Sequence, residues 1–160
     1  MRWELVVRGS PACKGSWQPI GIGRPTMAGG VRCYPLKQVR LKADEPERLA
    51  RWKHALELAV LDAGRPKQPL AGVAVSVQAV FYLHRPQRPE HTQPIGRVGD
   101  LDKLLRAVGD VLTGVYYADD SQIVDWSACK IYEDADHPEG AAIVINIVDD
   151  AQKPLTLIED

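Results

Sequence analysis

The stretch VAVSVQAVFYL, residues 73–83, decides how this chain folds. Its odd-numbered residues, from Val73 to Leu83, are all apolar, whereas Ser76 and Gln78 place polar groups at even positions. An alternation with a period of two is typical of a β-strand that buries one face. The stretch therefore predicts a strand whose odd-numbered side chains belong to the core.

Helices are predicted on both sides of this strand in the chain. Residues 46–63 carry apolar side chains at three- and four-residue spacing, begin with Pro46 and are followed by Gly64. A second amphipathic helix is predicted for residues 101–113. Shorter apolar segments predict further strands at residues 3–8, 122–132 and 141–148. The order β, α, β, α, β, β predicts an α+β fold, a mixed β-sheet with two main helices packed on it.

Two segments between these elements predict long exposed loops. Residues 9–30 are rich in Gly, Pro and Ser, and residues 84–99 contain three prolines. We expect one domain over residues 1–148, followed by an acidic, flexible tail at 149–160.

The composition is that of a soluble globular protein. The chain has 160 residues, of which 45% are apolar and 26% charged. Its three cysteines are widely spaced and form no CxxC pair, which argues against a disulfide framework or a zinc cluster. No apolar run approaches the about eighteen residues that a membrane span needs, so we expect a cytoplasmic protein.

Charge is segregated along the chain although the net charge is only −1. Residues 1–40 carry a net charge of +6, and residues 100–139 carry −7. A basic arm with an acidic block is what a polyanion-binding protein with a carboxylate metal site would need. Chance patterning of a solvated surface explains the charges alone equally well.

Asp100 and Asp102 are the first candidate metal ligands. Within a helix, Asp102 and Arg106 lie one turn apart on the same face. Asp100 would point away from Asp102 if it were also helical, so we expect it before the helix. As an N-cap residue it can turn toward Asp102 while it accepts hydrogen bonds from backbone donors.

Asp119 and Asp120 directly precede the strand predicted for residues 122–132. Neighbouring strand residues point to opposite faces, so only one of the two carboxylates can join the site, and the other serves the turn. Three clustered carboxylates repel by ~3 kcal/mol per pair at about 5 Å and an effective dielectric constant of about 20. A divalent cation removes that repulsion, and oxygen-only ligation favours Mg²⁺ or Mn²⁺.

A purely structural interpretation stays open for the same residues. Asp100 then caps the helix, and Asp102 complements the helix dipole and pairs with Arg106, without any chemistry.

The run GDLDKLLRAVGDVLTGVYYADDSQIV, residues 99–124, resembles the signature of the RusA family of Holliday junction resolvases. The shared pattern is DxD, a basic residue four positions on, DxLxG and then DDxQ. The likeness covers most of residues 3–148 and is weaker outside the signature. It implies a magnesium-dependent homodimeric endonuclease that cuts four-way DNA junctions in recombination and repair, in a bacterial or phage-infected cell.

The resemblance also implies roles for individual residues. By motif register, the family's metal-binding aspartates fall on Asp100, Asp102 and Asp120, and its catalytic lysine falls on Arg106. Arginine can clamp a phosphate but stays protonated, so it cannot shuttle a proton. Basic residues of the loops and the second helix are the candidate contacts to DNA phosphates: Lys14, Arg24, Arg32, Lys37, Arg85, Arg88, Arg97 and Lys103.

Two other functions stay open. Because Arg106 replaces the lysine, the chain could be a non-cleaving module that binds branched DNA. A phosphohydrolase that acts on small molecules would use similar carboxylates. A nuclease of the PD-(D/E)xK type is not expected, because no acidic-x-lysine motif follows the first aspartate.

Overall fold

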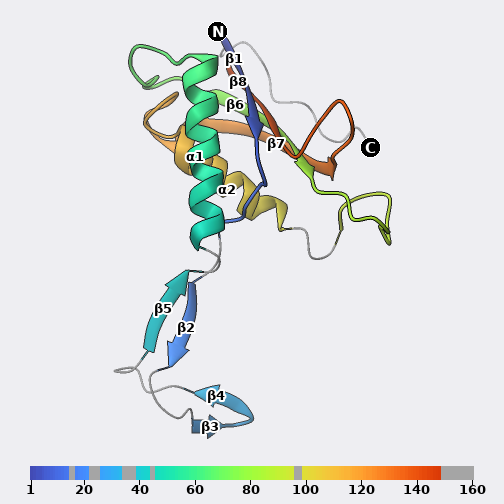
Figure 1. Cartoon of the computed structure of the whole chain (residues 1–160). Helices are drawn as coiled ribbons and strands as arrows, with labels where there is room; N and C mark the ends of the chain where they lie inside the picture. The colour runs from blue at the N-terminus through green and yellow to red at the C-terminus, as the bar shows by residue number, and fades with distance from the viewer. Residues whose placement is uncertain (15–16, 22–25, 34–38, 44–45, 96–98, 149–160) are drawn as a thin grey trace, which may run out of the picture.

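A mixed four-stranded sheet carries the fold of the computed structural model, which describes residues 1–14, 17–21, 26–33, 39–43, 46–95 and 99–148 (Figure 1). Its strands lie in the order β1 (Arg2–Arg8), β8 (Gly140–Ile147), β6 (Val75–Leu83) and β7 (Ile123–Tyr132). The pairs β1/β8 and β8/β6 are antiparallel, whereas β6 and β7 are parallel. Parallel neighbours need a crossover connection, and the chain from β6 to β7 supplies it through α2 (Leu101–Leu112). The predicted α+β fold with a mixed sheet is confirmed.

The core lies between one face of the sheet and the two helices. The odd-numbered residues of β6 from Val75 to Leu83 are at most 3% exposed, as the alternation predicted. Trp52 of α1 (Pro46–Ala63) and Leu104 of α2 pack into the same cluster. The even-numbered residues of β6 and β8 are mostly less buried, and both helices lie over the buried face (Figure 1). The four-stranded sheet and the two helices therefore form two layers.

The prediction of one long loop over residues 9–30 is wrong. This region contributes β2 (Trp17–Gly21) and β3 (Thr26–Ala28), and these pair with the later strands β5 (Val39–Ala43) and β4 (Val31–Cys33), respectively. β3 and β4 form a hairpin around Gly29 and Gly30, which both have positive φ. Two such glycines suit a two-residue hairpin turn. The Gly- and Pro-rich composition of the whole segment resembles that of a loop, so this hairpin pattern was overlooked. These short strands lie beyond the N-terminal end of α1 (Figure 1).

The position of α2 over β7 depends on Gly109. A Cβ atom built on Gly109 would lie 2.7 Å from Cη2 of Trp126 in β7, closer than real contacts allow. Glycine normally weakens a helix interior, so its presence here is explained by the close approach of the two elements. The backbone of α2 can rest on the indole ring only while residue 109 has no side chain.

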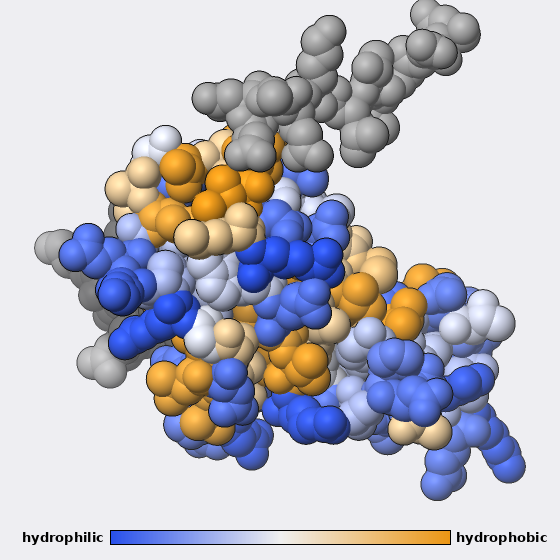
Figure 2. All heavy atoms as spheres, turned by 90° about the horizontal axis from the view of Figure 1, so that it is seen from above, coloured by the Kyte–Doolittle hydropathy of each residue, from blue (hydrophilic) through white to orange (hydrophobic). Residues whose placement is uncertain are grey.

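The surface carries scattered apolar side chains. Seen from above, they form patches separated by polar residues (Figure 2). Among the described residues, the large exposed apolar side chains are Met1, Val6, Met27, Val31, Leu58, Leu61, Ile95 and Val124. None of them belongs to α2, so the exposed face of that helix is polar. No helix in the described part of the chain is long and apolar enough to cross a membrane.

The contact between Gly109 and Trp126 gives a test of helix placement. Gly109→Ala should lower the free energy of unfolding by about 1–3 kcal/mol, because the new methyl group collides with the indole. In a Trp126→Phe background, where the outer ring atoms are gone, the same change should be neutral or stabilising by up to about 1 kcal/mol. Urea denaturation of the four proteins in this cycle measures both effects. Equal effects in the two backgrounds would show that the indole does not set the helix position.

Candidate active site

The N-terminal end of α2 carries the first acidic residues of the predicted site. Asp100 has extended backbone angles, φ −80° and ψ 134°, directly before the helix. The prediction that Asp100 precedes the helix as its N-cap residue is confirmed. Its side chain, however, accepts no hydrogen bond from the helix backbone, so the expected side-chain cap is wrong.

Lys103 takes the place of the backbone donors. Its Nζ lies 2.6 Å from Oδ2 of Asp100. This hydrogen bond lowers the pKa of Asp100 and raises the pKa of Lys103. The nearby Asp102 carboxylate raises the pKa of Lys103 further. The ammonium group thus lies within the electrostatic reach of both carboxylates, where it offsets their repulsion.

Asp102 and Arg106 form the predicted pair along the helix. Arg106 Nη2 donates to Asp102 Oδ2 over 2.9 Å, and the two side chains are 65% and 63% exposed. Exposed ion pairs of this kind contribute little to stability. The carboxylate of Asp102 is therefore available to a competing cation.

Three contacts fix the backbone around Asp100. Lys130 Nζ in β7 donates to the carbonyl oxygen of Gly99 over 2.8 Å. The Cys13 thiol lies 3.7 Å from the Asp100 carbonyl oxygen, and the Lys14 N–H donates to the Lys103 carbonyl oxygen over 3.1 Å. Burial raises the pKa of the Cys13 thiol, so it stays protonated as a donor. The strand β7 and residues 13–14 together hold this turn.

Gly99 cannot be replaced in this turn without strain. Its φ is +63°, a conformation that side chains disfavour. A Cβ atom would also lie 2.9 Å from the Cys13 sulfur.

The segment DDSQ, residues 119–122, forms a short capped turn before β7. The Asp119 carboxylate accepts from Ser121 N at 2.9 Å, and the hydroxyl and the N–H of Ser121 together lower the pKa of Asp119. Oε1 of Gln122 accepts from the N–H groups of Ala118 and Asp119, while its Nε2 donates to the Val73 carbonyl oxygen. Asp119 therefore serves the turn as its N-cap residue, whereas Asp120, which is equally in the exposed class, takes no part in that cap.

The structure of one chain does not bring Asp120 to the acidic pair. Asp120 lies beside Tyr117, whose pKa burial raises to about 12 with a further contribution from the Asp120 carboxylate. Tyr117 bridges to Thr113, at the C-terminal end of α2. Asp100 and Asp102 lie at the opposite end, and twelve helical residues span about 18 Å. The assignment of Asp120 as a metal ligand stays a prediction.

The candidate DNA contacts fall in different parts of the structure. Lys103 pairs with Asp100, and the Arg85 guanidinium lies 6.0 Å from the centre of the Tyr132 ring. Arg32 in β4 and Arg88 are exposed. Arg24, Lys37 and Arg97 lie outside the described residues.

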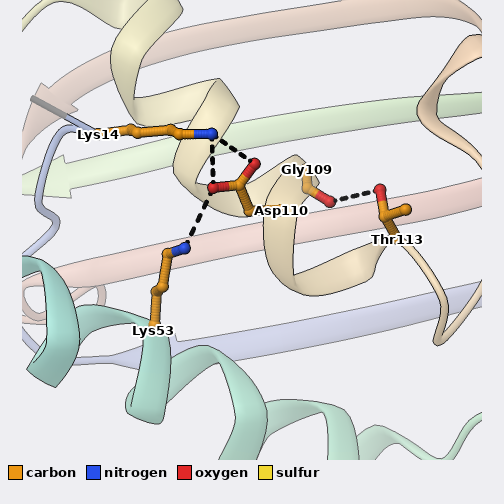
Figure 3. Close-up of polar contacts among 5 residues, drawn as sticks. All are labelled: Lys14, Lys53, Gly109, Asp110 and Thr113. Atoms are coloured by element: carbon orange, nitrogen blue, oxygen red, sulfur yellow. Dashed lines mark hydrogen bonds and ion pairs between the residues drawn. The ribbon is translucent and has the colours of Figure 1, made fainter. Parts of the chain in front are cut away.

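Lys14 belongs to an ion cluster that the sequence did not predict. Its Nζ lies 2.9 Å from both carboxylate oxygens of Asp110, and Lys53 of α1 donates to the same carboxylate over 3.1 Å (Figure 3). Asp110 belongs to the DxLxG part of the signature. The signature thus contains this residue but does not identify the two lysines that bind it. No local pattern could pair it with residues 96 and 57 positions away.

The donors at the start of α2 suit a hard divalent cation. Asp100 and Asp102 offer exposed carboxylate oxygens, which Mg²⁺ prefers, and a cation bound there would replace Lys103 and Arg106 as their partners. Within the described ranges, no group of three or more His, Cys, Asp or Glu side chains is close enough to hold a metal ion. Asp100 and Asp102 are therefore two of the three carboxylates that the predicted cation site needs.

Comparison with known proteins agrees with the signature. The family model described as endodeoxyribonuclease RusA matches residues 17–146. This range includes Asp100, the helix α2 and the segment DDSQ at residues 119–122. No curated protein matches the chain. The match spans well over half of the sequence, and the chain belongs to the RusA family of Holliday junction resolvases.

Proposed function

We propose that this chain is a Mg²⁺-dependent homodimeric endonuclease that resolves Holliday junctions by paired cuts. The observation that carries the proposal is the acidic pair at the start of α2, held in a braced turn and balanced by Lys103. Family membership supports the activity on DNA. The metal dependence, the dimer and the residue roles are inferred from the site.

Asp100 and Asp102 would hold the divalent cation. Both carboxylates are exposed, and their partners Lys103 and Arg106 can swing away on long side chains. A cation bound there would polarise the scissile phosphate and acidify an attacking water.

Arg106 and Lys103 would receive the DNA phosphate. The guanidinium of Arg106 carries more N–H donors than Asp102 accepts, and it stays charged throughout the reaction. It can therefore stabilise negative charge that develops on the phosphate, but it cannot move a proton. Lys103 lies on the adjacent part of the same helix face and can contact the next oxygen.

Asp120 would complete the cation site of a second copy. It lies about one helix length from the acidic pair of its own chain. A two-fold axis that sets two α2 helices antiparallel and side by side, with the polar stripe of each still open to DNA, would place Asp120 of each copy beside Asp100 and Asp102 of the other. Such a dimer has two equivalent sites, as paired cuts in a nearly two-fold symmetric junction require.

Cleavage assays test the activity. With Mg²⁺, the protein should cut a labelled four-way junction and leave a linear duplex intact, and EDTA should abolish cutting. Asp102→Asn should still bind the junction while its cleavage rate falls by at least about 100-fold. Asp136→Asn, which removes an exposed carboxylate elsewhere, is the matched control and should cut normally.

Three results would contradict this function. Cutting in EDTA would exclude the metal. Wild-type binding without cutting would favour the non-cleaving module, and turnover of nucleotides without junction cutting would favour the small-molecule phosphohydrolase.

Mixing inactive variants tests the shared site. Neither Asp102→Asn nor Asp120→Asn should cut alone, but a refolded mixture should regain nicking at about a quarter of the wild-type level. Half of the dimers are then mixed, and each mixed dimer has one intact site out of two. A mixture of Asp100→Asn with Asp102→Asn should regain nothing, because both residues come from the same copy. Failure of the first mixture would place all three carboxylates in one chain.

A further inference from the structure

Asp110 has no part in the proposed chemistry, yet it lies on the same face of α2 as the acidic pair. Asp102, Arg106 and Asp110 follow at four-residue intervals, so their side chains form one stripe along the helix. Asp110 lies about 12 Å along the axis from Asp102. A DNA strand that ran along this stripe from the acidic pair would pass Arg106 and then Asp110.

Two lysines from separate elements converge on Asp110 (Figure 3). Lys14 follows β1 and lies 2.9 Å from both carboxylate oxygens, and Lys53 of α1 lies 3.1 Å from Oδ2. Burial opposes the ionisation of Asp110, but the hydrogen bonds from both lysines outweigh it and lower the pKa. The carboxylate is therefore charged, and the three groups together keep a net positive charge.

The lysines remain open to solvent in this arrangement. The side chains of Lys14, Lys53 and Asp110 are 46%, 33% and 32% exposed. Two ammonium groups carry more N–H donors than one carboxylate accepts, so donors remain for an anion. The partial exposure means that a phosphate can approach both lysines while Asp110 still holds them.

A purely structural role explains this cluster poorly. The main-chain bond from Lys14 N to the Lys103 carbonyl oxygen already attaches this segment to α2. The helices α1 and α2 are joined through buried side chains such as Leu56 and Leu104. Partly exposed ion pairs add little to packing of that kind.

We propose that Asp110 is a positioning residue that holds Lys14 and Lys53 as a clamp for a backbone phosphate of DNA. The inference rests on the proposed function and adds a defined contact to it. The clamp would grip the strand within a few nucleotides of the scissile phosphate, because Asp110 lies about 12 Å along the helix from Asp102. It reads no base, so it contributes affinity and register rather than sequence preference.

The clamp predicts that removal of a negative charge from this face weakens DNA binding, which is the opposite of the usual effect. Removing an acidic residue from a DNA-binding face ordinarily strengthens binding, because repulsion of the phosphates falls. Asp110→Asn should instead weaken binding to a four-way junction about three- to tenfold, since both lysines lose the group that orders them. Lys14→Gln and Lys53→Gln should each lower the slope of log affinity against log salt by about 0.9.

The experiment measures junction binding in EDTA, where no cutting occurs, over a range of salt concentrations. It compares wild type, Asp110→Asn, the Lys14→Gln/Lys53→Gln double variant and the triple variant. Asp62→Asn, an exposed carboxylate on α1, is the matched control and should bind no more weakly than wild type. In the background without the lysines, Asp110→Asn should no longer weaken binding. Lys14→Arg/Lys53→Arg should keep the salt slope, a result that a structural role alone does not predict.

Each result decides between the alternatives. Unchanged or tighter binding by Asp110→Asn, with wild type binding normally, overturns the positioning role. An unchanged salt slope in the lysine variants overturns the clamp, and these variants decide the matter if Asp110→Asn fails to fold. A wild-type protein that does not bind the junction overturns the proposed function together with the clamp. Binding with the expected slopes but without cutting, when Mg²⁺ is added, overturns only the proposed cleavage.

Discussion

The turn from Gly99 through Asp100 into α2 is the constraint on which the proposed site depends. Asp100 must be extended and Asp102 helical for their carboxylates to share one cation, and only a helix start between them allows both conformations. The ion pair with Lys103 and the bond from Lys130 to Gly99 hold this geometry. Because Lys130 lies in β7, the turn is attached directly to the sheet.

The helix α2 combines two tasks on opposite faces. Leu104 and Leu112 lie in the core, while Asp102, Arg106 and Asp110 form the polar stripe. The contact of Gly109 with Trp126 sets the height of the helix over β7. The packing of apolar residues in the core therefore sets the positions of the polar side chains on α2. A change in the core would move the whole polar stripe together.

Local periodicity was sufficient to predict the helices and the central strand. The helix at residues 46–63 and the pair of Asp102 with Arg106 follow from spacing alone, because their partners are within one or two turns. The short strands at residues 17–33 were missed, since Gly- and Pro-rich composition resembles that of a loop. The cluster around Asp110 depends on contacts between distant parts of the chain, which no local pattern contains.

The sheet topology has a consequence for how the chain matures. β1 pairs only with β8 within the four-stranded sheet, with Arg2 opposite Asn146 and Arg8 opposite Gly140. During synthesis, the first strand has no neighbour in this sheet until the last one leaves the ribosome. Contacts of such long sequence separation form slowly, so the backbone of β1 has no strand partner in this sheet until β8 is made. The nascent chain is then most vulnerable to aggregation through its first strand, and chaperones that bind apolar segments would find it there.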